Sequence, residues 1–127
     1  MKHRFISILF ILIVMAALQY FSYRDTDSLE RDFLDMVTLN EKSNVDYGEL
    51  KRYRYDMHAG TKVAKVTAEL ERYGVYHNFR KGVIFVQYTI MWEDAQGNNL
   101  NGCIVDAKWF VKKKNGRWLV YDIKENP

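Results

Sequence analysis

The side chains best suited to chemistry are an acid and several aromatic residues in the second half of the chain. Asp106 interrupts the apolar stretch CIVDAKWFVK, and burial of its carboxyl group would raise its pKa toward the range of a general acid. Tyr88 and Trp92 belong to a neighbouring apolar stretch and could line a pocket around it. Alternation along the strand instead turns Asp106 to solvent, on the face opposite Trp109. A pocket around Asp106 is therefore the alternative, and an exposed Asp106 is the expectation.

Tyrosine and arginine alternate in LKRYRYDMH, residues 50–58. Such a pattern can stack bases or hold anionic headgroups. Neighbouring acids dilute its positive charge, so packing of Tyr53 and Tyr55 against a sheet, with the arginines in solvent, is favoured. The candidate face for a ligand or partner comprises Tyr53, Tyr55, Tyr88, Trp92 and Asp106.

Other reactive side chains lack a suitable context. His3, His58 and His77 are too far apart in the sequence for the close spacing of a zinc site. Cys103 is the single cysteine, so no internal disulfide can form, and burial as a small apolar side chain is favoured over pairing between chains. Dispersed glycines predict no phosphate-binding loop. We expect no enzyme activity, no metal and no cofactor.

The charge balance argues against a polyanionic partner. The chain has 19 basic and 16 acidic residues, and setting aside Lys2 and Arg4 leaves 17 against 16. A nearly neutral domain has no overall field to attract nucleic acid. We therefore expect a membrane and a protein partner, and no nucleic acid.

The N-terminal segment is apolar enough to cross a membrane. Residues 5–23 follow two basic residues and end in an aromatic cluster, and about 20 apolar residues span a ~30 Å hydrocarbon core. A cleaved signal peptide is the second interpretation, but the apolar run continues past Ala16 at the weak cleavage site. A buried core helix is the third, although a helix apolar on every face suits lipid better. A retained signal anchor is favoured.

Basic residues favour an N-terminus in the cytoplasm. Lys2 and Arg4 precede the apolar segment, whereas Arg24 follows it alone before Asp25 and Asp27. A domain facing the cytosol is the alternative. The favoured division is a cytoplasmic N-terminus at residues 1–4, a transmembrane signal anchor at 5–23 and an extracytoplasmic domain at 24–127.

The rest of the chain predicts one helix followed by strands. Residues 25–42 place Leu29, Phe33 and Met36 at helical spacing, with Asp27 as the expected cap and Glu30 completing a capping box. Residues 43–61 have no sustained period and predict a loop or a short second helix. Alternation predicts strands at residues 83–92, 103–112 and 117–124.

Two connections bear on the sheet. Asn115-Gly116 between alternating apolar residues is a strong hairpin signal, which places the lysine triplet 112–114 at a solvated hairpin end. Residues 61–77 fit either a helix or a strand. A strand is favoured because it gives residues 83–92 a long neighbour and completes a four-stranded antiparallel meander.

This order of helix, linker and strands, with the closing WFVKKKNGRWLVYDI, resembles small extracytoplasmic domains of the NTF2-like and cystatin-like type. The resemblance covers roughly residues 28–124, is architectural, and implies a curved sheet wrapped around a helix. A membrane span before such a domain also looks like the VirB8-type components of conjugation machines, although this chain is short for one. NTF2-like enzymes place Asp and His inside the cone, but no such motif is matched here.

The expected fold is therefore α+β: a transmembrane helix, then an amphipathic helix packed on a curved four-stranded antiparallel sheet. The expected function is a non-enzymatic binding or assembly module at the cell membrane, presenting an open sheet face to a protein or small ligand. An NTF2-like enzyme with a pocket around Asp106 and a cytosol-facing membrane-bound regulator are the alternatives.

Overall fold

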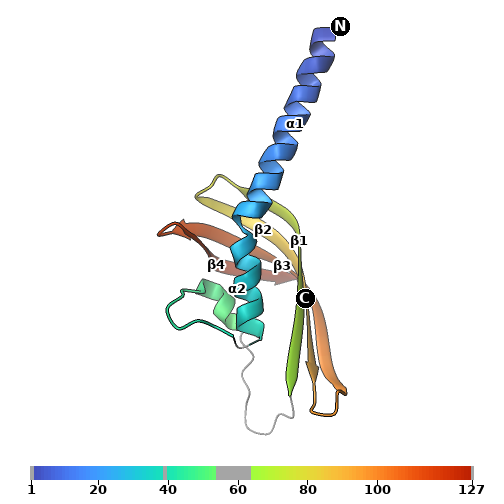
Figure 1. Ribbon diagram of the computed structural model, residues 1–127, viewed down its shortest axis with the longest axis vertical. Coiled ribbons are helices and arrows are strands. Elements are labelled where there is room, and N and C mark those ends of the chain that lie inside the picture. The colour runs from blue at the N-terminus through green and yellow to red at the C-terminus, as the bar shows by residue number, and fades with distance from the viewer. Residues whose placement is uncertain (1, 39, 54–63, 127) are drawn as a thin grey trace.

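The computed structural model describes residues 2–38, 40–53 and 64–126 (Figure 1). Its strands form one antiparallel sheet in the order β1-β2-β3-β4, so that each strand pairs with its neighbours in the sequence. The fold is α+β, as the sequence predicts. The elements are α1 (Lys2–Asp25), α2 (Asp27–Val37), the 3-10 helix η1 (Gly48–Tyr53), β1 (Lys65–His77), β2 (Lys81–Glu93), β3 (Asn99–Lys114) and β4 (Arg117–Asn126).

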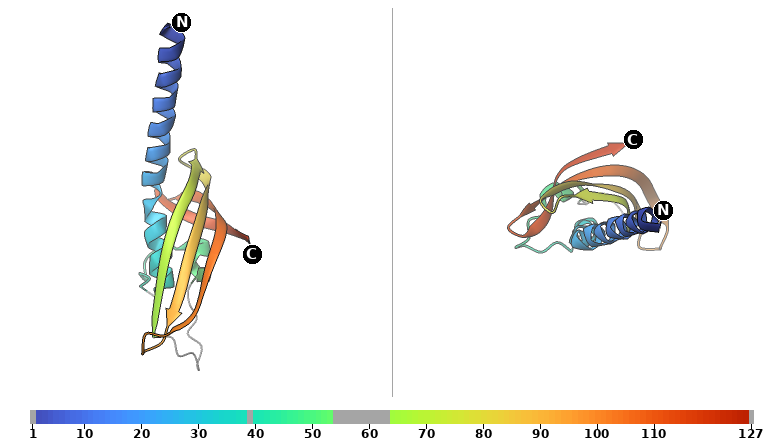
Figure 2. Two further views of the ribbon diagram at one scale, coloured as in Figure 1. Left: turned by 90° about the vertical axis from the view of Figure 1, so that its right-hand side faces the viewer. Right: turned by 90° about the horizontal axis from the view of Figure 1, so that it is seen from above.

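The sheet is curved, and the helices lie on its inner side (Figure 2). The sequence of residues 61–77 fits either a helix or a strand, and the described part of this segment is a strand: β1 pairs with β2 from Lys65 to His77. Residues 61–63, the start of that segment, lie outside the described residues. Its register shifts between Arg72 and Gly74, a bulge that lets both Arg72 and Val75 face the helices.

The β3–β4 hairpin confirms the predicted Asn-Gly turn. Asn115 and Gly116 have φ angles of 54° and 77°, and two positive φ values are what a two-residue type I′ turn requires. The lysines beside it are engaged within the chain: Nζ of Lys113 lies 3.4 Å from a carboxylate oxygen of Asp25, and Nζ of Lys114 lies 3.7 Å from one of Asp46. The lysine triplet therefore belongs to the hairpin, and two of its lysines form ion pairs with acidic residues elsewhere in the chain.

Helix α2 supplies one wall of the core. Its apolar face, spaced by three and four residues, is fully buried against the inner face of the sheet, while η1 adds Leu50 and Tyr53. The helix is shorter than predicted and ends at Val37. The buried side chains of this face are Leu29, Phe33, Met36 and Val37.

The predicted capping box is wrong. Asp27 is the first residue of α2, and the cap position belongs to Thr26. Its hydroxyl accepts no backbone N–H of α2 and instead donates to the carbonyl oxygen of Ser22 at 3.0 Å. Asp27 and Glu30 instead form ion pairs with Arg72 of β1. The two carboxylates thus bind a distant side chain, Arg72, in place of the backbone N–H groups at the start of the helix.

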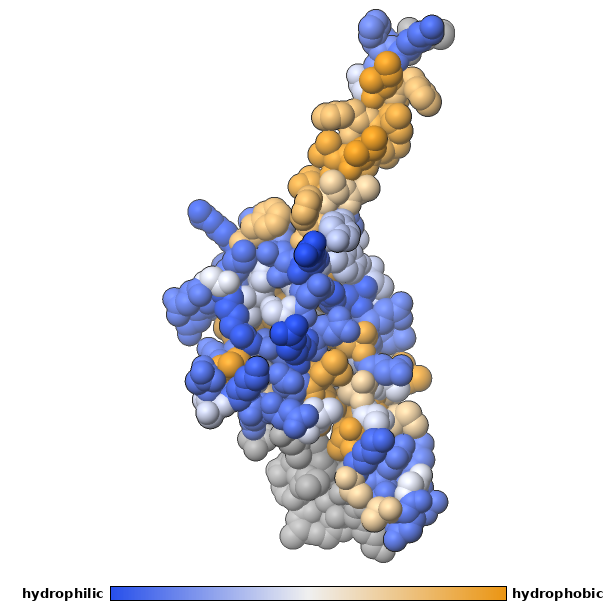
Figure 3. All heavy atoms as spheres, viewed as in Figure 1, coloured by the Kyte–Doolittle hydropathy of each residue, from blue (hydrophilic) through white to orange (hydrophobic). Residues whose placement is uncertain are grey.

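Helix α1 is long and apolar enough to cross a membrane. At 1.5 Å per residue its 24 residues extend about 36 Å, and its apolar side chains are exposed along most of that length. Figure 3 shows them as a band that ends where the polar domain begins. The last two turns are part of the domain: Ser22 is buried, and the side-chain amide of Gln19 donates to the carbonyl oxygen of Val75 at 3.2 Å.

Strand β4, at one edge of the sheet, is hydrogen-bonded to both helices. Arg117 donates to Asp32 at 2.6 Å, and the indole of Trp118 donates to Asp25 at 2.7 Å. Burial raises the pKa of Asp32, and the Arg117 guanidinium opposes this rise. Loss of the Arg117 guanidinium would therefore raise the pKa of Asp32 further.

Arg72 joins the helices to β1. Its guanidinium donates to the carbonyl oxygen of Tyr23 at 2.8 Å and to the hydroxyl of Thr26 at 2.9 Å, and it pairs with Asp27. The Arg72 side chain is only 10% exposed, so these bonds are largely shielded from water. One side chain thus binds backbone and side-chain groups at the junction between α1 and α2.

We expect Arg72→Ala to lower the free energy of unfolding by about 3 kcal/mol, because hydrogen bonds to a charged group are worth roughly 1.5–3 kcal/mol each and Tyr23 and Thr26 lose their donor. Arg72→Lys should recover less than half of this, since an ammonium cannot reach all three partners. Urea unfolding of the full chain in detergent, followed by tryptophan fluorescence, measures it. Arg80→Ala, on an exposed turn, is the control, and equal losses in the two alanine variants would contradict the assignment.

Candidate binding surface

Two of the predicted site residues meet inside the core. The rings of Tyr53 from η1 and Tyr88 from β2 lie 4.9 Å apart, and both side chains are buried. Phe33 and Trp109 pack against them, with ring centroids 5.1 to 6.1 Å from Tyr53. These rings fill the space between α2 and the sheet.

The hydrogen bonds of this cluster are structural. The indole of Trp109 donates to the Tyr53 hydroxyl at 3.1 Å, and the Tyr88 hydroxyl donates to Glu125 at 2.8 Å. Burial raises the pKa of both phenols, and Glu125 adds to the effect. Both tyrosines therefore stay neutral at physiological pH and cannot serve as bases.

The other predicted site residues do not form one continuous surface with Tyr53 and Tyr88. Trp92 lies on the same side of β2 as Tyr88, half-buried and packed at the edge of the core. Tyr55 lies outside the described residues. Asp106 is exposed on the opposite side of the sheet, where it accepts a hydrogen bond from Gln87 at 3.2 Å. The expected exposure of Asp106 is confirmed, but its grouping with Tyr88 and Trp92 on one face is wrong, because alternation separates them.

The remaining reactive side chains are also accounted for. Cys103 is half-buried and packs against the core. Nε2 of His77 lies 3.2 Å from the carbonyl oxygen of Ser22, and the imidazole stacks against Trp118. Within the described ranges, no group of three His, Cys, Asp or Glu side chains could hold a metal ion.

The outer face of the sheet carries an aromatic band that no helix of the described residues covers. Tyr73 and Tyr76 of β1 lie 6.0 and 6.1 Å from Phe85 of β2, and Phe110 of β3 lies 6.4 Å from Tyr121 of β4. The three tyrosines are between 40% and 58% exposed. We call these five residues the outer aromatic band; it crosses all four strands.

Lysines connect and flank the rings of this band. Nζ of Lys108 lies 5.2 Å from the centre of Phe85 and 6.0 Å from that of Phe110, and Lys124 also lies over Phe110, at 5.5 Å. Cation–π contacts of this kind hold a charge beside an apolar surface. The band therefore offers aromatic area together with positive charge on β3 and β4.

Sequence reasoning missed this band. Alternation places Phe85 and Phe110 in the same phase of their strands as Gln87 and Lys108, but neither phenylalanine was among the candidate residues. The signal that could have identified it is a set of large aromatic side chains beside lysines, at the strand positions that alternation turns to solvent.

Comparisons with protein-family models, with curated proteins and with solved structures found no match. The likeness to NTF2-like and cystatin-like domains is therefore supported only in its coarse features: an apolar N-terminal helix and a curved four-stranded antiparallel sheet with helix contacts.

We expect Tyr53→Phe to cost about 1–3 kcal/mol of unfolding free energy, because it leaves the buried Trp109 indole N–H without its acceptor. Tyr121→Phe removes the same atom from an exposed ring and should change stability by less than about 0.5 kcal/mol. Denaturant unfolding of both variants makes the comparison. A Tyr53→Phe protein as stable as the wild type would contradict a structural role for the Tyr53 hydroxyl.

Proposed function

We propose that this chain is a single-pass membrane protein of the NTF2-like or cystatin-like architectural type, whose domain lies outside the cytoplasmic membrane and binds a partner protein. It is a binding or assembly module and not an enzyme. The observation that carries the proposal is the outer aromatic band, an uncovered surface of tyrosine and phenylalanine on a sheet whose other side is occupied by helices.

The filled inner side argues against the enzyme alternative. An NTF2-like enzyme needs a pocket with a titratable side chain inside the cone, whereas here the rings of Phe33, Tyr53 and Tyr88 occupy that space. Asp106, the acid required by that alternative, faces the other way. Binding on the outer face needs no such pocket.

The composition of the band suits a protein partner with acidic side chains. Aromatic residues contribute strongly to protein interfaces because they bury much area with little loss of side-chain freedom. Lys108, Lys112 and Lys124 lie over its rings and add positive charge. Carboxylates on the partner would complement these ammonium groups and orient the complex.

Orientation is supported by the residues at the two ends of α1. Lys2 and Arg4 lie at its start, whereas Arg24 at its end is followed by Asp25 and Asp27. Basic residues are retained preferentially on the cytoplasmic side. The domain then lies outside, anchored by α1.

A cysteine at Gln96 should be labelled in intact cells by a membrane-impermeant thiol reagent, in a chain whose Cys103 is replaced by Ala. Gln96 lies in the exposed β2–β3 turn, so substitution disturbs no core contact. Gel mobility of the labelled chain reports whether the anchor is retained. Labelling that requires lysis would place the domain in the cytosol, and a shortened labelled chain would mean a cleaved signal.

A photo-cross-linking amino acid at Tyr121 should give a discrete adduct in intact cells, because Tyr121 is the exposed end of the outer aromatic band. Lys108→Glu combined with Lys124→Glu should reduce the adduct about tenfold or more, since like charges would replace complementary ones. Immunoblotting of the chain measures the yield.

The matched control carries the cross-linker at Gln96, which is exposed but remote from the band. It should give no adduct of the same mass. The partner proposal fails if both positions give the same product, or if the charge reversal leaves the Tyr121 adduct unchanged while the domain remains folded by tryptophan fluorescence.

A further inference from the structure

The β1–β2 turn holds a large apolar side chain in solvent beside the end of α1. Phe79 is 46% exposed and has a φ of 67°, a conformation that is rare for a bulky residue. The turn is nevertheless well bonded: the Asn78 carboxamide oxygen accepts the backbone N–H groups of Arg80 and Lys81 at 3.0 and 2.9 Å. The exposure of Phe79 is thus a fixed feature of the turn.

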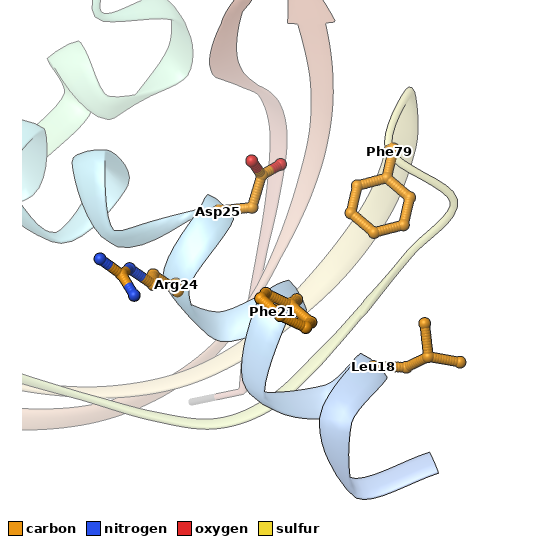
Figure 4. Close-up of a pocket in the computed structure, with 5 residues that line it drawn as sticks. All are labelled: Leu18, Phe21, Arg24, Asp25 and Phe79. Carbon is orange, nitrogen blue, oxygen red and sulfur yellow. The ribbon is translucent and has the colours of Figure 1, made fainter. Parts of the chain in front are cut away.

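A wedge-shaped groove separates this turn from α1. It has a volume of about 540 Å³ and is lined by Leu18, Phe21 and Phe79 with Arg24 and Asp25. Figure 4 shows Phe79 extending from the turn toward the side of α1 that bears Phe21 and Leu18, with Arg24 on the other side of the helix. The groove therefore has apolar side chains on both sides, Leu18 and Phe21 from α1 and Phe79 from the turn, and the carboxylate of Asp25 also lines it.

The position of this groove along α1 determines its depth in a membrane that α1 would span. About 20 residues cross the hydrocarbon core, so a span that starts near Phe5 reaches the headgroup region near Arg24. Leu18 and Phe21 then lie at the boundary between acyl chains and headgroups. Phe79 lines the same groove and lies at the same depth, where aromatic side chains are favoured.

Basic residues lie beside the turn. Arg80 is exposed in the turn and Lys81 is exposed at the start of β2, and the backbone N–H of Lys113 donates to the Arg80 carbonyl oxygen at 2.8 Å, which brings the β3–β4 hairpin alongside. The nearby acid is Asp25, which pairs with Lys113. Basic residues at this level are attracted to an anionic membrane surface.

We propose that the groove binds an anionic phospholipid of the membrane that α1 spans, with acyl chain against Leu18, Phe21 and Phe79 and phosphate beside Arg80 and Lys81. This inference rests on the proposed anchoring of α1, and it is independent of the partner on the outer face. The turn is then a second membrane contact that limits rotation of the domain about its anchor.

The test uses the full chain in nanodiscs with Phe79→Trp and lipids brominated on the acyl chain, which quench tryptophan on contact. Fluorescence of the parent chain in the same discs is subtracted for its own tryptophans. We expect strong quenching of the residue at 79 and none in a Gln96→Trp chain, whose new ring lies at the distal turn. Equal quenching at the two positions, or none at 79, overturns the proposal.

Headgroup preference is tested in the same Phe79→Trp chain. At equal mole fractions, brominated phosphatidylglycerol should quench at least about fivefold more effectively than brominated phosphatidylcholine, because Arg80 and Lys81 both attract its anionic headgroup. Arg80→Glu with Lys81→Glu should abolish the preference, whereas Lys51→Glu with Lys65→Glu, an equal charge change at exposed positions elsewhere, should keep it. A preference that survives the first pair or is lost in both pairs overturns specific binding at the groove.

The two proposals fail in distinguishable ways. A chain that does not remain in the nanodisc after high-salt washing lacks the anchor, which contradicts the proposed function itself. A chain that is retained but shows no quenching at position 79 keeps its anchor and lacks only the lipid contact. Loss of the cross-link at Tyr121 would affect neither result.

Discussion

The arrangement of the molecule depends on the bonds of Arg72 at the junction of its two helices. Because only Thr26 separates α1 from α2, the direction of the long apolar helix is set where that junction meets the sheet. Arg72 binds the carbonyl oxygen of Tyr23, the hydroxyl of Thr26 and the carboxylate of Asp27 together. Arg72 faces the inner side in phase with Leu70, and the β1 bulge that follows lets Val75 face inward as well.

A second set of bonds prevents the helices from pivoting about that point. Trp118 and Arg117 of β4 donate hydrogen bonds to Asp25 and Asp32, so the helices are bonded to both edge strands of the sheet, β1 and β4. Helix α2 is consequently pressed against the inner face, and its phenylalanine completes the aromatic core. The outer face receives no such cover from the described residues, which is why its aromatic side chains remain available.

Local features could be predicted from the sequence and distant ones could not. Asn115-Gly116 determines its own turn, and the spacing of Leu29, Phe33 and Met36 identifies the buried helix face. The role of Asp27 could not be read in this way, because a cap and an ion pair use the same carboxylate and the deciding partner is 45 residues away. Period-two alternation likewise gives two faces for each strand, and with aromatic residues on both, only the position of α2 decides which one is buried.

The orientation of the sheet relative to α1 restricts where a partner can bind. Strands β1 and β2 extend between the end of α1 and the distal β2–β3 turn, the β3–β4 hairpin crosses to the side, and the outer face is directed away from the helices (Figures 1 and 2). With α1 across a bilayer, this face is directed along the membrane surface and not away from it. A partner held in the same membrane would therefore meet the outer aromatic band at a high effective concentration. A lipid contact at Phe79 would strengthen this effect, because it would keep the face from rotating about the anchor.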